Sequence, residues 1–245
     1  MKIAIYGDSY GCINTKWEGG VVGPGLSWVD RLEYSHDIVN FSKSGTAFMY
    51  SYEKFLEENQ KFDLNIFAVT SPHRVYIKAL DGQSLIFGPD FIDLQIKRIK
   101  GLPLYPKQHD HIEILKSAKV HVDLWADWKM ITHIQSILVK NISVMRPNTL
   151  LLPGFLDSFE NAKFGLYPLM LHELMLVDAK KSKTIDWSDL QCHRKCHFSS
   201  ENNLVLFNKI DAAIKLGKTS IEIDESDIVK PIGSFDSFVT LHNRK

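Results

Sequence analysis

Hydrophobic residues along the chain follow two patterns: short apolar runs, and longer stretches in which apolar residues recur every three or four positions. The runs are typical of buried strands, whereas the longer stretches are typical of amphipathic helices. Strands are therefore predicted over residues 2–6, 36–41, 62–70 and 148–153, with a further strand-like stretch over 219–223. Helices are predicted over 26–32, 47–62, 166–178 and 201–216, and residues 109–144 are predicted to form one long helix or two helices with a kink between them.

The order of these elements predicts the architecture. Strands and helices alternate along most of the chain, which favours an α/β fold, a three-layer sandwich built around a parallel sheet. Residues 1–216 are expected to form a single domain, and residues 217–245 a C-terminal extension. The long helical stretch and several turn signals predict a helical cap or insert within 73–145, with a hairpin over 76–87.

Charge and cysteine content narrow the class of partner and the compartment. Lys and Arg number 29 and so do Asp and Glu, so there is no net charge to attract nucleic acid or anionic lipid. No apolar run is long enough to span a membrane, and the short first run leads directly into Gly7 rather than forming a signal peptide. Three cysteines, an odd number, argue against a disulfide framework. We therefore expect a cytoplasmic protein with no nucleic-acid or membrane partner.

The first predicted strand ends in Gly7-Asp8-Ser9, and this places a hydroxyl at the carboxyl edge of the sheet. Open α/β sheets bind their ligands at this edge. Much later, His197 stands just before the last clear helix. A serine hydroxyl needs a base within hydrogen-bond reach, and a neutral imidazole suits this task. Taken alone, His197 also fits a helix-capping or core position, so the hydrolase hypothesis requires folding to bring the two residues together.

The chain also resembles a known family. Four blocks, found in the family's order between residue 3 and about residue 216, carry the resemblance: Gly7-Asp8-Ser9, Val39-Asn40 followed by Ser44-Gly45, Val69-Thr70-Ser71, and His197 before a helix. Together they are similar to the SGNH, or GDSL-type, esterase and lipase family. The resemblance implies a flavodoxin-like α/β/α sandwich with Ser9 as nucleophile and His197 as base. It also implies that the N–H groups of Ser9 and Gly45 form two arms of an oxyanion hole, and that no metal or organic cofactor is needed.

The sequence departs from the family pattern at two positions. The family usually has an asparagine at the end of the third strand, where this chain has Thr70 and Ser71. Losing one oxyanion donor costs about 2.7–4 kcal/mol, so either Thr70, Ser71 or a nearby group substitutes for the asparagine, or the enzyme is slow. Thr70 is the first candidate. The family also usually has an aspartate three residues before the histidine, where this chain has Arg194. Asp189 is the first choice for the residue that orients His197; Asp186 and a Ser-His dyad oriented by a backbone carbonyl are the alternatives.

These observations favour a serine esterase that acts on a small acyl ester, such as an O-acetyl group on a carbohydrate. One rival is a binding or structural module that keeps the scaffold without efficient catalysis. The other is a zinc-dependent hydrolase that uses the cluster Cys192-His193-Arg194-Lys195-Cys196-His197. Because adjacent residues rarely ligate one ion together, we interpret these cysteines as small buried residues and expect no metal. His109-Asp110-His111 is likewise interpreted as a solvated helix start rather than a metal site.

Overall fold

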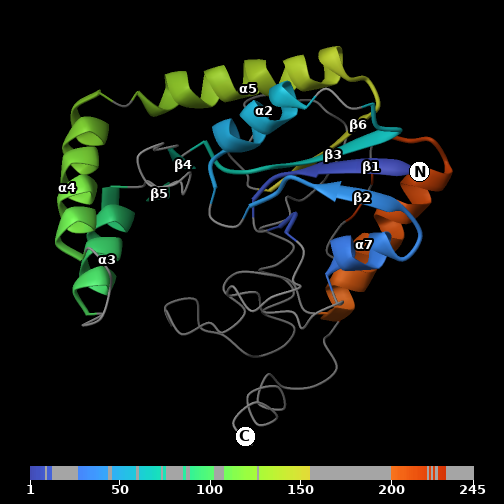
Figure 1. The fold of residues 1–245 in the computed structure, drawn as a ribbon, viewed down its shortest axis with the longest axis horizontal. Helices are drawn as coiled ribbons and strands as arrows, with labels where there is room; N and C mark the ends of the chain where they lie inside the picture. The colour runs from blue at the N-terminus through green and yellow to red at the C-terminus, as the bar shows by residue number, and fades with distance from the viewer. Residues whose placement is uncertain are drawn as a thin grey trace, which may run out of the picture.

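Four parallel strands form the central sheet in the part of the chain that the structure describes. The computed structural model describes residues 1–8, 10–12, 27–43, 46–58, 61–72, 74–75, 85–86, 89–101, 108–125, 127–154, 200–219, 221, 223 and 226–229. The strands are β1 (Lys2–Tyr6), β2 (Asp37–Asn40), β3 (Leu64–Val69) and β6 (Thr149–Pro153), and they lie in the order β2-β1-β3-β6 (Figure 1). All three pairings are parallel, and they place Ile5 between Asn40 and Ile66. The α/β class and the parallel sheet are therefore confirmed.

Helices cover both faces of this sheet. Helices α1 (Trp28–Glu33) and α7 (Ser200–Lys215) pack on one face, whereas α2 (Phe48–Glu57) and α5 (Trp128–Met145) pack on the other (Figure 1). Successive side chains of a strand point to opposite faces, so Ile3 and Ile5 lie in the α1 and α7 core while Ala4 and Tyr6 lie in the α2 and α5 core. This arrangement agrees with the predicted three layers.

The residues between β3 and β6 have two different roles. Helix α5 belongs to the sandwich, because Val139 and Ile142 are buried in the same core as Phe67 of β3. Helices α3 (Pro89–Lys100) and α4 (Gln108–Trp125) pack against each other to one side of the sheet, next to the antiparallel pair of β4 (Arg74–Val75) and β5 (Leu85–Ile86) (Figure 1). Helix α5, which falls within the predicted insert, is therefore a helix of the sandwich on the connection from β3 to β6.

Several predicted boundaries shift in the structure. The stretch 109–144 forms two helices, and Asp127 starts the second one by accepting hydrogen bonds from the N–H groups of Lys129 and Met130. Helix α2 ends at Glu57 rather than at residue 62, and the sequence pattern does not predict α3. No strand is assigned to the described residues of 219–223; Ile221 and Ile223 instead lie buried in the α1 and α7 core. The helix predicted over 166–178 lies outside the described residues.

Among the described residues, every helix is too short or too polar to cross a lipid bilayer.

Arg146, the residue that follows α5, joins β1, β3 and the end of α2. Its Nη1 donates to Tyr6 Oη at 3.2 Å and to Asn65 Oδ1 at 3.4 Å, and its Nη2 donates to the carbonyl oxygens of Phe55 and Glu58 at 2.8 and 2.5 Å. The last two oxygens belong to the end of α2, where carbonyl groups have no partner within the helix. Burial raises the pKa of the Tyr6 phenol above its ordinary value, and the charge of Arg146 opposes this shift.

We expect Arg146→Lys to lower the free energy of unfolding by about 2 kcal/mol, because a single ammonium group cannot reach all four acceptors. Chemical denaturation followed by circular dichroism measures this change. The matched control is Arg31→Lys on α1, since among the described residues the Nε of Arg31 has no hydrogen-bond partner. Equal losses of stability in the two variants would contradict the prediction.

Candidate functional site

The order of the strands determines where a ligand can approach the sheet. From β1 the chain crosses to β2 on one side, and it then returns to β3 on the other side of β1. In open α/β sheets ligands bind beyond the carboxyl ends of the strands at such a reversal. Gly7 and Asp8 follow β1, and Thr70 follows β3. These residues therefore border the position where a ligand is expected.

A tight turn follows Asp8. The backbone N–H of Tyr10 donates to Asp8 Oδ1 at 3.0 Å, and that of Gly11 donates to the backbone oxygen of Asp8, also at 3.0 Å. The Asp8 side chain is buried, and its other oxygen, Oδ2, accepts a hydrogen bond of 2.8 Å from the Thr70 hydroxyl. Asp8 thus holds the residue after Ser9 and also joins the ends of β1 and β3. Ser9 itself lies outside the described residues.

The segment that contains Gly45 is held against the same turn. The N–H of Lys43 donates to the backbone oxygen of Gly7 at 3.1 Å, and the buried Thr46 hydroxyl lies 3.5 Å from that oxygen. Asn40, at the end of β2, donates from Nδ2 to the backbone oxygen of Gly11 at 2.7 Å. Gly45 lies outside the described residues, but described residues on both sides of it contact Gly7.

Trp28 connects this turn to the start of α7. The Trp28 indole N–H donates to the backbone oxygen of Tyr10 at 2.7 Å, and the Trp28 backbone N–H donates to Asn203 Oδ1 at 3.2 Å. Ser27 and Asp30 form a capping box that starts α1 at Trp28. At the other end of the contact between α1 and α7, His36 Nε2 lies 3.8 Å from Asp211 Oδ1. The two helices therefore run parallel, and both begin on the side of the sheet where the strands end.

The structure describes Ser71, the alternative oxyanion donor, which is buried. It also describes Thr70, the first candidate for this donor. It is buried, and its hydroxyl hydrogen is used in the bond to Asp8. Gln135 of α5 donates from Nε2 to the Thr70 backbone oxygen at 2.9 Å, which holds the end of β3 in place. In this arrangement the Thr70 hydroxyl positions Asp8. Donation to an oxyanion, as predicted from the sequence, would require this bond to open.

We expect Thr70→Val to lower the free energy of unfolding by about 1–2 kcal/mol, because Asp8 Oδ2 is buried and loses a donor. Thr70→Ser keeps the hydroxyl and is the matched control, so its loss of stability should be smaller. Thermal and denaturant unfolding of the two variants measure the difference. If both variants were equally stable and only Thr70→Val lost kcat, the hydroxyl would act on the substrate, as the oxyanion prediction requires.

The remaining predicted site residues lie outside the described residues. They are Ser9, Gly45, Asp186, Asp189, Arg194, His197 and the cysteines of the 192–197 cluster. Their predicted roles stay predictions. What the structure does place is their described neighbours in the chain: Asp8 and Tyr10 around Ser9, Lys43 and Thr46 around Gly45, and Ser200 three residues after His197.

Sequence reasoning misses the residues that connect these segments. The motif Gly7-Asp8-Ser9 by itself gives Asp8 no role, Trp28 fits a core position or the rim of a substrate site, and Asn203 is simply part of the last predicted helix. The sequence does carry a signal for Asn203, because two adjacent asparagines are poor helix formers. Asn202 and Asn203 lie in the first turns of α7, and both are buried.

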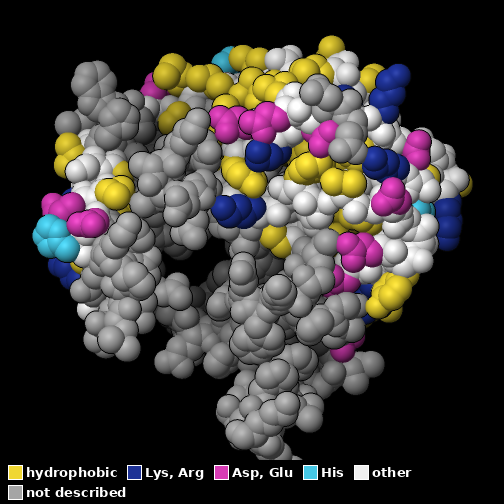
Figure 2. Space-filling model, viewed as in Figure 1, with side chains coloured by type: hydrophobic (Ala, Val, Ile, Leu, Met, Phe, Trp, Pro, Cys, Tyr) yellow, Lys and Arg dark blue, Asp and Glu magenta, His cyan; other side chains and the backbone are white. Residues whose placement is uncertain are grey.

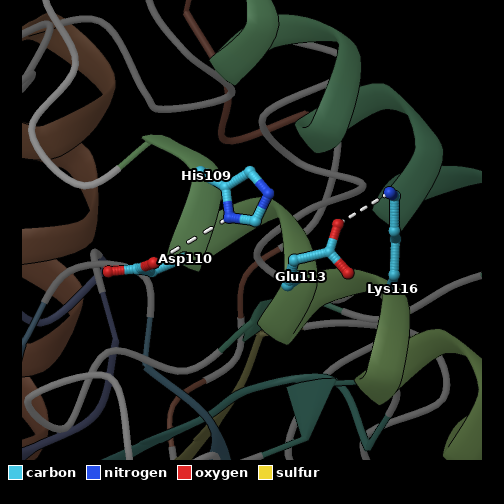
Figure 3. A network of polar contacts seen from close by, with 4 residues as sticks. All are labelled: His109, Asp110, Glu113 and Lys116. Atoms are coloured by element: carbon cyan, nitrogen blue, oxygen red, sulfur yellow. Dashed lines mark hydrogen bonds and ion pairs between the residues drawn. The ribbon is translucent and has the colours of Figure 1, made fainter.

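The histidine-containing start of α4 has the character of a solvated surface. Figure 3 shows His109 and Asp110 side by side, with the Nδ1 of His109 4.0 Å from Asp110 Oδ1, and both side chains are largely exposed. Further along the helix, Lys116 donates to Glu113 at 2.8 Å and so lowers the pKa of the Glu113 carboxyl group. Within the part of the chain that the structure describes, no three His, Cys, Asp or Glu residues lie close enough together to hold a metal ion.

Comparison with known proteins adds no family assignment: no protein-family model matches the chain, and no curated protein matches its sequence.

Proposed function

We propose that the protein is a serine esterase with a flavodoxin-like sandwich of the SGNH type, in which Ser9 is the nucleophile and His197 is the base. The observation that carries the proposal is the connection through Trp28. This residue is bonded to Tyr10, one position after Ser9, and to Asn203, six positions after His197. Ser200 is the third residue after His197, and three residues span at most about 10 Å. The length of the chain therefore allows His197 to reach the turn that carries Ser9, and this supports the proposal.

The Gly45 segment supports the same proposal. An oxyanion hole needs two or more N–H groups that converge on one point close to the nucleophile. Lys43 and Thr46 contact Gly7 from either side of Gly45, and Asp8 constrains the turn around Ser9. The N–H groups of Ser9 and Gly45 thus belong to two segments that are bound to each other at the end of β1.

The proposed reaction proceeds in two halves. Ser9 Oγ attacks the ester carbonyl carbon while His197 accepts the hydroxyl proton, and the N–H groups of Ser9 and Gly45 stabilise the negative charge on the carbonyl oxygen. His197 then gives this proton to the departing alcohol, which leaves an acyl-Ser9 ester. In the second half His197 accepts a proton from water while the resulting hydroxide attacks the acyl carbon. His197 then returns this proton to Ser9 Oγ as the bond between Ser9 and the acyl group breaks, and the acid is released. Every bond change is made by the residues and water, so no cofactor is required.

The proposed substrate is a small acyl ester, such as an O-acetyl group carried by a carbohydrate, and the proposed compartment is the cytoplasm. An odd number of cysteines supports a reducing compartment. Asp189 stays the first choice for the residue that orients His197. The bond between Thr70 and Asp8 supports an oxyanion hole that relies on backbone N–H groups rather than on a side chain at the end of β3.

Labelling with a fluorophosphonate probe tests the proposal. The probe reacts with an activated serine, so we expect one labelled peptide, identified by mass spectrometry as the one that contains Ser9. The matched control variant is Ser35→Ala, which should keep this label, because Ser35 is exposed and precedes β2 at the opposite end of the sheet. Labelling should persist in the presence of a chelator, whereas a zinc-dependent hydrolase would release zinc and lose activity. Absence of labelling in the folded protein would favour a binding module.

A further inference from the structure

The outer face of α5 carries an exposed row of apolar side chains. The row, here called the α5 stripe, consists of Met130, Ile134, Ile137, Val144 and Met145, and each of these residues is 45–77% exposed. Figure 2 shows hydrophobic side chains gathered along the edge of the molecule where α5 lies in Figure 1. Its apolar area is on the order of 500 Å², which is within the range of the largest patch on a typical monomer, and such patches are often functional.

The stripe is not needed to hold α5 in place. The opposite side of the helix makes the contacts with the sheet: Val139 and Ile142 are buried in the core, and Gln135 and Ser136 are buried beside them. The bond from Gln135 to the Thr70 backbone oxygen fixes the helix further. The helix therefore has two apolar faces, and the sheet covers only one of them.

The spacing of the stripe is that of a coiled-coil seam. Met130, Ile137 and Val144 are seven residues apart, and Ile134 and Asn141 each follow one of them by four. In a heptad these residues occupy three d positions and two a positions, which are the positions that meet in a pair of helices. Asn141 is the only polar residue of the seam, and it is exposed. An asparagine at an a position pairs with its own copy and sets register.

We propose that the α5 stripe binds a second copy of this chain, with the two α5 helices parallel and in register about a two-fold axis. Asn141 favours a second copy of the chain over a lipid surface as the binding partner. In a pair of helices each Asn141 amide meets the other, whereas in a bilayer the amide would be buried without a partner at a cost of several kcal/mol. The stripe itself offers on the order of 500 Å², which is well over half of the roughly 800 Å² that each partner buries in a stable complex, so residues beside the stripe would supply the remainder.

Charge favours the parallel arrangement. The g positions of α5 are His133 and Lys140, and no acidic residue occurs in the helix. In a parallel pair these positions lie opposite the e positions of the second copy, which are Leu138 and Met145, so no like charges meet. In an antiparallel pair His133 of one copy would lie opposite Lys140 of the other, which is an unfavourable contact when the imidazole is protonated. The residues that flank the seam therefore favour the parallel orientation of the two helices.

Analytical ultracentrifugation of the full chain over a range of concentrations tests the proposal. The wild type should form dimers, and Ile137→Glu should weaken the association by roughly 30-fold or more, because the change removes two central contacts per dimer. Leu216→Glu is the matched control, since Leu216 is exposed at the end of α7 and should leave the dimer intact. Circular dichroism should show that all three proteins are folded. A monomeric wild type, or a dimer unaffected by Ile137→Glu, would overturn the proposal.

Crosslinking tests the orientation of the helices. In a parallel pair Val144→Cys lies next to its own copy, so mild oxidation should give a disulfide between the two introduced cysteines, identified by mass spectrometry. In an antiparallel pair this disulfide would not form, and only the double variant Met130→Cys/Val144→Cys would crosslink. Flotation of a monomeric wild type with phosphatidylserine vesicles would overturn the proposal in favour of a lipid surface.

Discussion

Ser9→Ala is expected to lower kcat for hydrolysis of p-nitrophenyl acetate by on the order of 10³-fold or more, and His197→Ala by a similar factor. The reason is that the two residues act as one unit, because the hydroxyl is a poor nucleophile without the base and the base has nothing to deprotonate without the hydroxyl. The double variant should therefore be no slower than either single variant. Steady-state kinetics of the three variants measure this non-additivity.

Two matched controls separate this effect from general damage. Ser35 and His109 are exposed and belong to none of the predicted site segments, so Ser35→Ala and His109→Ala should keep wild-type kcat. All variants should keep the wild-type circular dichroism spectrum. If the losses in Ser9→Ala and His197→Ala multiplied in the double variant, the residues would act separately. If Ser9→Ala hydrolysed the ester at the wild-type rate, the chain would be a binding module.

Gly7→Ala is expected to lower the free energy of unfolding by about 3 kcal/mol, the largest effect on stability among the proposed variants. A Cβ atom at this position would lie 2.7 Å from the Cβ of Ala68 and 2.9 Å from the Ala68 backbone oxygen, and Gly7 has a φ of +154°. Overpacking costs about 1–3 kcal/mol and backbone strain costs a similar amount. The backbone atoms of β3 cannot move aside without disturbing its pairing with β1 and β6. Chemical denaturation measures the change.

Gly217→Ala is the control for the strain alone. Gly217 follows α7 with a φ of +63°, and an added Cβ would meet no atom within 4 Å, so this variant should lose only about 1 kcal/mol. A double variant, Gly7→Ala/Ala68→Gly, removes the contact between the two Cβ atoms and should recover part of the lost stability. If Gly7→Ala and Gly217→Ala were equally destabilising, close packing between β1 and β3 would not be the cause.

The central strands and the helices that cover them could be predicted because each carries its own pattern. Residues 2–6 are predicted and observed as a strand, and 201–216 as a helix with almost the same bounds. Burial of a strand or of one helix face requires a local periodicity, and this periodicity is visible without knowledge of the partner. Helix α3 escaped prediction because it packs mainly on α4, away from the sheet, and its apolar residues lie within a stretch rich in turn signals.

The candidate site likewise has a part that could be predicted from the sequence and a part that could not. Gly7-Asp8-Ser9 could be recognised because it is a contiguous motif after a strand. The contacts that hold this motif could not, because they join Asp8 to Thr70, 62 residues away, and Trp28 to Asn203, 175 residues away. For Thr70 the structure adds a contact that the sequence does not show, a hydrogen bond to Asp8, while donation to the substrate stays a prediction. A sequence shows that a hydroxyl is present, but only its neighbours in space determine where the single hydrogen is directed.

The sequence by itself determined the α/β class, most of the central strands and helices, and the position of Ser9 directly after the first strand. These properties depend on residues that are close together in the chain. Their periodicity indicates which face of a strand or helix is buried, and turn residues indicate where it ends. The tertiary structure decided the order β2-β1-β3-β6, the assignment of α5 to the sandwich, and the connection of the starts of α1 and α7 to the end of β1. Each of these depends on which distant segments pack together, and packing is settled by the whole core rather than by any one segment.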